Sequence, residues 1–225
     1  MVWRYHPDTR EFEIFAEGGG NVFGLEFDTA GRLFSGHNGG GTRGFHYVQN
    51  GFYLKQGKSP GKFGPPDNPF SFGELPMMPG GNIPRFSHNV IAVNGSAMQE
   101  AWQGKLLGAD PLHRHLVLSE RTAIGASFTT RDIDFPVKNS DVAFRPVYMV
   151  NAPDGSVLVA DFYERYIAHG QHYQSQIDPT SGRVYRIRAK EKPRNTNTQL
   201  SGKTDAQLVQ LLTHPDKWHR QTAVR

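Results

Sequence analysis

The sequence contains no cysteine. Disulfides, thiolate metal centres, a cysteine nucleophile and a covalently attached c-type haem are therefore excluded within this chain. It also lacks any apolar run close to the ~20 residues that a membrane-spanning helix needs. The first residues, Met1 to Arg4, lead into a strand pattern and do not resemble a signal peptide. We expect no membrane span in this chain.

Neither sign of charge dominates, because 25 lysines and arginines are nearly balanced by 21 aspartates and glutamates. The formal net charge is only +4 over 225 residues and does not form a stripe, so the sequence does not point to a nucleic-acid partner. The motifs Gly-x-Ser-x-Gly, His-Glu-x-x-His and a phosphate loop ending in Gly-Lys-Ser/Thr are absent. Gly39-x-Gly41-x-x-Gly44 matches a dinucleotide fingerprint in letters, but a strand pattern follows where that motif needs a helix.

Glycine and proline are plentiful, with 25 and 15 residues, which is typical of an all-β protein with many turns. One unit recurs: a glycine, a short apolar strand, and a polar residue where that strand ends. The three copies run from Gly31 to His37, from Gly104 to Asp110 and from Gly155 to Asp161. Repeats of about 40–50 residues built from short strands are typical of propeller blades.

The first two copies are farther apart than the last two because an insertion lies between them. Residues Lys55 to Arg85 are rich in proline, glycine and phenylalanine and show no periodicity, so we expect a long loop there. We read Asp132 to Val142 as a polar crossing between blades. The predicted fold class is all-β: about three blades of a six-bladed β-propeller, followed by a short α-helical, HEAT-like segment.

The pattern changes near the C-terminus. We predict propeller blades over residues 1–189, a polar linker over 190–202 and a helical repeat over 203–225, where Leu208, Leu211 and Leu212 share one helical face. His214-Pro215-Asp216 separates two helices. Because such a pair cannot bury its apolar face alone, we expect the chain to be a fragment of something longer.

A propeller gathers sequence-distant polar residues on one rim. Asn21, His88 and Arg145 open the predicted inner strands, whereas His37, Asp110 and Asp161 close the second strands. These side chains can bind a polar ligand, accept a proton or hold a hard cation. The alternative is that Asp110 and Asp161 cap turns and pair with nearby arginines.

Histidines elsewhere are less specific. His169 follows Asp161 in a loop, and the two could form a metal or acid–base site, although a simple surface loop is the alternative. His113 and His115 flank Arg114 at the start of a strand, where alternation places both on one face. For this pair we predict ordinary packing or solvent exposure.

Several short motifs together resemble one family. They are Phe23-Gly24-Leu25-Glu26-Phe27-Asp28, Gly31-Arg32-Leu33-Phe34, Phe144-Arg145-Pro146-Val147, Pro153-Asp154-Gly155, Ala160-Asp161-Phe162-Tyr163, Ile167-Ala168-His169-Gly170 and Gly182-Arg183-Val184-Tyr185-Arg186-Ile187. They resemble proteins assigned as membrane-bound dehydrogenases in planctomycetes and related bacteria, which are similar to glucose/sorbosone dehydrogenases. Leu208 to Arg225 resembles the first of the HEAT-like repeats that follow the propeller in that family.

The resemblance implies a six-bladed propeller that uses pyrroloquinoline quinone and calcium, in a periplasmic or extracellular location. It implies His37 or His88 as the base, and Asn21, Arg43, Arg145 and Asp161 as cofactor contacts. Asp110, Asp161 and His169 would be the candidate metal ligands. An electron acceptor such as a cytochrome c domain would lie outside this chain, because the haem motif is absent. Many relatives carry Asp-Cys or Asp-Ser where Gly36-His37-Asn38 stands here.

Three functions remain open at this point. The first is a quinone-dependent oxidoreductase that acts on a sugar or related alcohol. The second is a non-catalytic propeller that binds a glycan or a protein through its rim. The third is a propeller hydrolase or lyase. The fold alone does not separate them, because propellers host many functions.

Overall fold

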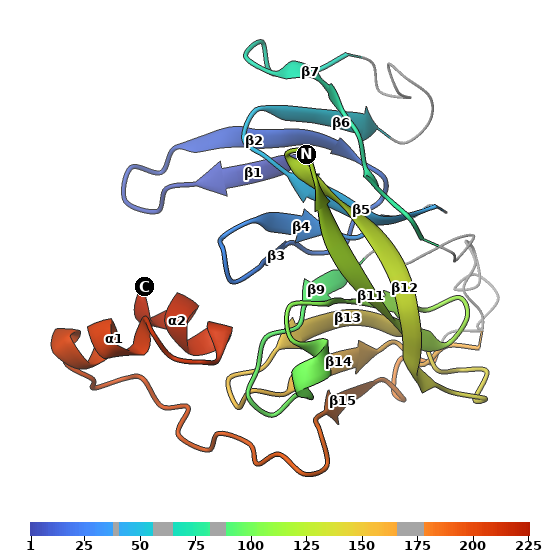
Figure 1. Cartoon of the computed structure of the whole chain (residues 1–225), viewed down its shortest axis with the longest axis vertical. Helices are drawn as coiled ribbons and strands as arrows, with labels where there is room; N and C mark the ends of the chain where they lie inside the picture. The colour runs from blue at the N-terminus through green and yellow to red at the C-terminus, as the bar shows by residue number, and fades with distance from the viewer. Residues whose placement is uncertain (38–40, 56–64, 82–88, 166–177) are drawn as a thin grey trace.

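The computed structural model describes residues 1–37, 41–55, 65–81, 89–165 and 178–225. Strands predominate in this part of the chain and form four small sheets, with two short helices beside them (Figure 1). The sheets pack face to face in succession, as propeller blades do. The fold is all-β and propeller-like, which confirms the predicted fold class.

Each repeated unit is a hairpin between an inner strand and a second strand. The pairs are β3 (Glu26–Phe27) with β4 (Leu33–Ser35), β9 (Val90–Ala92) with β10 (Leu106–Asp110), and β13 (Pro146–Asn151) with β14 (Val157–Asp161). Gly31, Gly104 and Gly155 have φ angles of +74°, +72° and +78°. Glycine adopts these left-handed angles without strain, so the three units share one turn chemistry.

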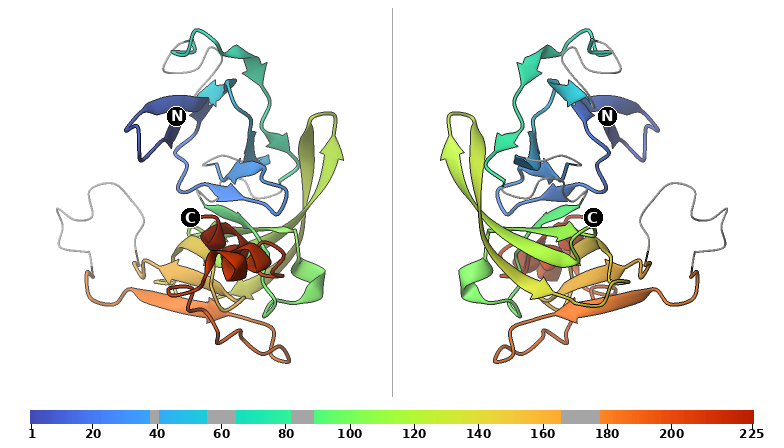
Figure 2. Two further views of the ribbon diagram at one scale, coloured as in Figure 1. Left: turned by 90° about the vertical axis from the view of Figure 1, so that its left-hand side faces the viewer. Right: turned by 90° about the vertical axis from the view of Figure 1, so that its right-hand side faces the viewer.

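The outer strands complete the blades. They are β5 (Thr42–Tyr47) with β8 (Met78–Pro79), β11 (His115–Ile124) with β12 (Ser127–Lys138), and β15 (Arg183–Ile187). The β11–β12 hairpin extends well beyond its own blade (Figure 2). Thr130 on this arm donates from Oγ1 to the carbonyl of Pro79 at 3.0 Å, so the arm contacts the preceding blade. The expectation of a crossing over 132–142 was wrong for residues 132–138, which belong to β12.

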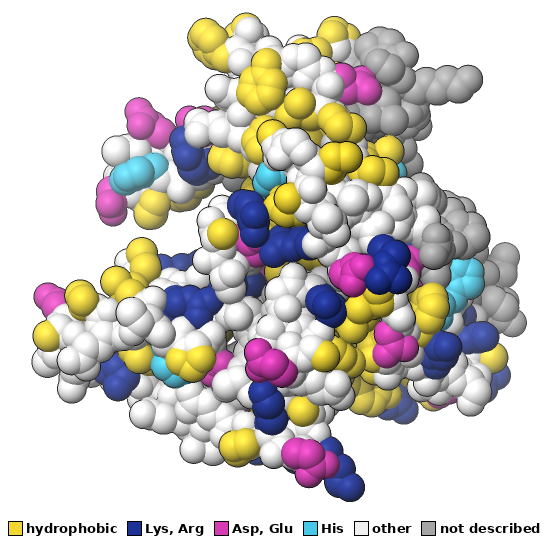
Figure 3. Space-filling view, in the orientation of Figure 1, with side chains coloured by type: hydrophobic (Ala, Val, Ile, Leu, Met, Phe, Trp, Pro, Cys, Tyr) yellow, Lys and Arg dark blue, Asp and Glu magenta, His cyan; other side chains and the backbone are white. Residues whose placement is uncertain are grey.

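The first sheet has an order that the sequence did not suggest. β1 (Val2–Tyr5) and β2 (Phe12–Gly19) form the expected hairpin, but β6 (Gly51–Lys55) and β7 (Phe72–Leu75) then add to it in parallel. The presumed loop over 55–85 therefore contains two strands, β7 and β8. Exposed apolar side chains gather over this sheet, as Figure 3 shows; they are Trp3, Tyr5, Phe12, Phe70 and Phe72.

Three buried clusters hold successive sheets together. Phe45, Tyr47 and Tyr53 fill the space between the first two sheets, and Phe34 and Met78 lie between the second and third. The largest cluster joins the third and fourth sheets; it contains Ile91, Leu107, Leu116, Met149, Val157 and Val159. Burying one such side chain contributes roughly 1.5–3 kcal/mol, so these interfaces fix the order of the blades.

The inner strands are also linked by polar contacts. Asn89 donates from Nδ2 to the carbonyl of Phe23 at 3.3 Å, and its Oδ1 accepts the N–H of Met149 at 2.8 Å. One amide thus joins three blades next to their shared centre. Asn151 makes a comparable link, because its Nδ2 donates to Glu26 Oε1 at 3.2 Å and to the carbonyl of Ala92 at 3.0 Å.

The helices are α1 (Asp205–Leu211) and α2 (Lys217–Ala223). Thr204 caps α1 in a capping box with Gln207, and the residues between the helices pack against the blades. Within the described ranges, the helices found are too short and too polar to cross a bilayer.

Candidate functional site

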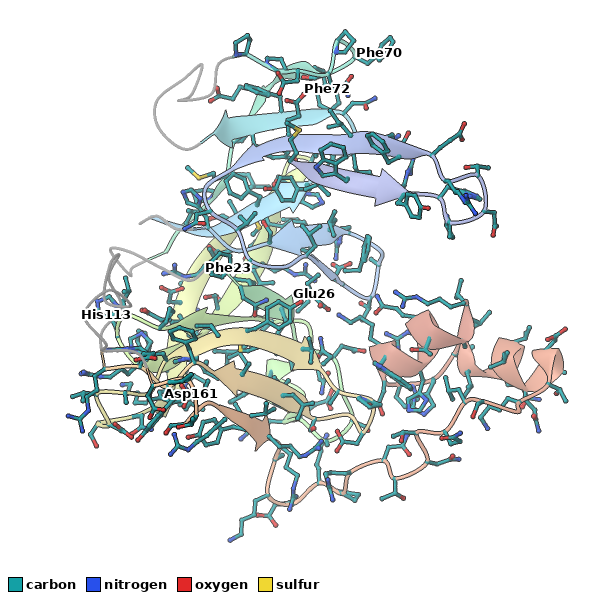
Figure 4. The ribbon with its side chains drawn as sticks, turned by 180° about the vertical axis from the view of Figure 1, so that it is seen from behind. Phe23, Glu26, Phe70, Phe72, His113 and Asp161 are labelled. Atoms are coloured by element: carbon teal, nitrogen blue, oxygen red, sulfur yellow. The ribbon has the colours of Figure 1, made fainter. Side chains whose placement is uncertain are left out.

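The site lies at the end of the blades where β10 and β14 finish, which we call the Asp110 end. Asp110 is the last residue of β10, Asp161 is the last residue of β14, and Arg145 immediately precedes β13. Arg145 donates from Nη1 to the carbonyl of Pro111 at 3.0 Å, which brings the two neighbouring blades together here. Figure 4 shows His113 and Asp161 on this side of the molecule.

Asp110 organises a tight cluster. Its Oδ1 accepts the backbone N–H groups of Leu112 and His113, both at 3.1 Å, so the carboxylate shapes the turn after β10. Arg114, with φ of +62°, stands at this turn and leads the chain into β11. His113 Nδ1 and His115 Nε2 then lie 2.7 Å and 3.1 Å from Asp110 Oδ2. We call these three residues (Asp110, His113 and His115) the Asp110 cluster.

The cluster combines a buried carboxylate with accessible imidazole. Asp110 is 0% exposed, whereas the His113 side chain is 47% exposed. Burial alone would raise the pKa of Asp110, but the adjacent His115 and His113 side chains and the backbone N–H of His113 outweigh burial and lower the pKa. The aspartate therefore stays ionised beside the two imidazole rings. This arrangement can accept a proton from a bound hydroxyl group.

Arg145 and Asp161 lie beside this cluster, and their side chains form hydrogen bonds with backbone groups. Arg145 donates from its guanidinium to the carbonyls of Pro111, Glu164 and Arg165 at 2.8–3.0 Å. Burial lowers the pKa of Arg145. Asp161 Oδ1 accepts the N–H groups of Arg145 and Tyr163 at 2.8 Å and 2.9 Å. Both residues therefore shape the loop that follows β14.

Arg43 lies away from this group. It is 1% exposed and forms a bidentate ion pair with Asp132 of β12, with Nε 2.6 Å and Nη2 2.5 Å from the carboxylate oxygens. Its Nη1 donates to the carbonyl of Thr42 at 2.8 Å. A role in binding a cofactor would require this buried ion pair to break.

The remaining predicted residues are placed as follows. His37 follows β4, at the position that corresponds to Asp110 and Asp161, and its ring packs edge-on against Phe45 at 5.2 Å. Asn21 is exposed, with φ of +51°, before β3. His88 and His169 lie outside the described residues. The structure thus brings together Asp110, Arg145 and Asp161, and it adds His113 and His115, for which the sequence predicts packing or solvent exposure.

The donor set does not match the group that the resemblance implies. Calcium requires 6–8 oxygen ligands, but the nearest partners of the Asp110 carboxylate are two imidazole nitrogens. The arginines expected to hold the carboxylates of a quinone are engaged with Asp132 and with backbone carbonyls. Asp110, Arg43 and Arg145 are therefore not arranged in this structure to hold calcium or the carboxylates of a quinone.

The opposite end of the blades, which we call the helix end, carries residues that sequence reasoning missed. Lys217 is 3% exposed; its Nζ contacts the Glu26 carboxylate and donates to the carbonyl of Phe27 at 2.6 Å. Burial and, to a smaller extent, the positive charge of Arg220 lower the pKa of Lys217 to about 7. A hollow of about 350 Å³ next to this pair is lined by Asn151, Trp218 and Gln221, among others.

A match to a family model places the chain in a family. No curated protein sequence matches it. A crystal structure from Thermus thermophilus, described as an oxidoreductase (glucose dehydrogenase), is similar at a TM-score of 0.47 and 18% identity. The similarity covers 77% of this chain and 46% of that one, so the chain spans less than half of that protein. The model of a family described as a domain of unknown function, DUF7133, matches residues 1–191, and the chain belongs to that family.

Proposed function

We propose that this chain is part of an oxidoreductase that oxidises a hydroxyl carbon of a sugar or related alcohol, with the Asp110 cluster as proton acceptor. The observation that carries the proposal is the pair of imidazoles within 3.1 Å of a fully buried carboxylate. A carboxylate behind an imidazole orients the ring and stabilises the imidazolium that forms when it takes a proton. The exposed His113 can meet a substrate hydroxyl.

The reaction also needs an acceptor for two electrons. The hydroxyl proton passes to the imidazole, and the hydrogen on the carbon leaves with its electron pair. The sequence resemblance to glucose/sorbosone dehydrogenases favours a quinone as that acceptor. Because Arg43 and Arg145 are engaged within the fold, its anionic groups would have to be held by other residues of the whole protein.

The test uses the protein that contains this chain, supplied with a soluble quinone as electron acceptor, and follows dye reduction across a panel of sugars and alcohols. We expect turnover that falls about 10²–10⁴-fold in a His113→Asn/His115→Asn variant, the usual contribution of a positioned base. His6→Asn is the matched control, because His6 is exposed in the β1–β2 turn, on another sheet.

Two outcomes would contradict the proposal. One is the absence of dye reduction with every substrate in the panel. The other is full activity in the double histidine variant. Saturable glycan binding without turnover would instead favour a binding propeller, and cofactor-free turnover of a polysaccharide would favour a hydrolase or lyase.

A further inference from the structure

A second group of histidines lies where the helices meet the blades. The chain between α1 and α2 is held against the connection that follows β9. Asp216 accepts the N–H and the hydroxyl of Ser96, the latter at 3.0 Å, and Asn94 Oδ1 accepts the N–H of Lys217 at 2.8 Å. These contacts fix the start of α2 at the helix end (Figure 1).

Three side chains of this segment converge. His214, Asp216 and His219 each offer one ligand atom, and these atoms lie within 4.8 Å of one another. His219 and Asp216 are both 1% exposed, and the two imidazole rings are 4.1 Å apart between centroids. We call these residues the His219 cluster. Their burial distinguishes them from surface groups that approach one another by chance.

The hydrogen bonding of His219 leaves one ring nitrogen available. Its Nε2 lies 3.0 Å from the carbonyl of Pro153, which can only accept, so Nε2 carries the proton. The Asn195 amide, 3.1 Å from Nε2, can turn its oxygen to the same proton. Nδ1 therefore presents a lone pair, and it is buried without a hydrogen-bond partner among the described residues. A buried acceptor of this kind calls for an explanation.

The other two members of the cluster lie close to one another. His214 Nδ1 accepts the N–H of Asp216 at 3.0 Å and lies 4.0 Å from Asp216 Oδ2. Because this nitrogen has a single lone pair, a metal ion bound to Nδ1 would take the place of that N–H.

We propose that His214, Asp216 and His219 bind a divalent transition-metal ion of the zinc type, which fastens the helical pair to the propeller. Two imidazole nitrogens and one carboxylate oxygen suit zinc better than calcium or magnesium, which prefer oxygen ligands. The surroundings support such a site, because the Pro153 carbonyl orients His219 and Ser96 orients Asp216. His214, with 21% of its side chain exposed, leaves a route for a water molecule as a further ligand.

Several positively charged groups surround the His219 cluster. Lys217 is neutralised by Glu26, and Arg220 donates to the carbonyls of His214 and Pro215. Lys203 also lies close enough to act on His219. The positive charges weaken cation binding, but Asp216 supplies one negative charge directly at the site. In the Asp110 cluster, by contrast, both imidazoles already approach the carboxylate within hydrogen-bond range.

The experiment titrates the 225-residue chain with Zn²⁺ by calorimetry and with Co²⁺ by visible absorption, which reports the ligand geometry. We expect one equivalent of each ion to bind, and zinc to raise the unfolding midpoint. His214→Ala should weaken binding by more than about 100-fold, because even outer-sphere changes cost about 10–100-fold. His219→Ala should do the same.

The matched control is His113→Ala/His115→Ala, which dismantles the other histidine group and should keep the zinc equivalent and its stabilisation. Circular dichroism checks that each variant is folded; His214→Ala serves if His219→Ala unfolds, because His214 is less buried. The proposal is overturned if no saturable binding occurs, if His214→Ala binds zinc like the parent chain, or if only the control variant loses binding. None of these outcomes depends on the proposed oxidation.

Discussion

The two ends of the propeller each gather two histidines around one aspartate, but they use the carboxylate differently. At the Asp110 end both imidazoles approach the carboxylate, and one of them is half exposed. At the helix end the Asp216 carboxylate accepts hydrogen bonds from Ser96, and the buried His219 Nδ1 has no hydrogen-bond partner among the described residues. The first arrangement suits movement of a proton to and from a ligand, whereas the second suits a fixed junction.

The comparison predicts that the helix end carries the larger share of stability. Glu26→Ala should lower the free energy of unfolding by about 3–5 kcal/mol, because it leaves the buried Lys217 side chain without its carboxylate partner. Urea unfolding followed by tryptophan fluorescence measures this effect. The double variant Glu26→Ala/Lys217→Met should recover most of the loss. A cost below about 1 kcal/mol for Glu26→Ala, the value typical of an exposed ion pair, would show that the junction is not structural.

At the Asp110 end, the prediction for Arg145→Met separates a structural role from a ligand-binding one. Three carbonyls, two of them in buried residues, would lose their donors, so we expect a loss of about 2 kcal/mol in the free energy of unfolding. Arg145→Lys keeps the charge but not the three-way geometry and should recover only part of it. If Arg145→Met left stability unchanged and weakened anion binding instead, that result would support Arg145 as a cofactor contact, the role that the family resemblance implies.

Local chemistry explains what the sequence could predict. The hairpins at Gly31, Gly104 and Gly155 follow from turn residues that need no distant partner. The polar residues that end the second strands, Asp110 and Asp161, follow from the same register. Both therefore lie at one end of the blades, as predicted.

Features set by distant partners could not be predicted in the same way. The parallel pairing of β6 with β2 depends on which edge is available, and alternation does not reveal that. An arginine looks the same in the sequence whether it binds a ligand, as expected for Arg43, or a buried carboxylate, as found with Asp132. The spacing Asp110-x-x-His113-x-His115 was a visible signal for the proton-accepting cluster, but only the turn at Arg114 shows that the rings fold back onto the carboxylate.

The smallest expected effect concerns pH and Asp110. Because the pKa of Asp110 is lowered in the folded chain, its carboxylate contributes stability above its ordinary value of 3.8, and this contribution is lost as the pH falls through the lowered value. Asp110→Asn should therefore cost about 1–2 kcal/mol at neutral pH, as expected for hydrogen bonds to a charged group. The unfolding free energy of Asp110→Asn should also depend less steeply on pH below about 4.

Thermal unfolding between about pH 7 and pH 3 measures both effects, with Asp8→Asn as control because Asp8 is exposed in the β1–β2 turn. Parallel pH profiles for the parent chain and Asp110→Asn would mean that the imidazoles do not hold this carboxylate ionised, and the Asp110 end would then lose its basis as a proton-accepting site.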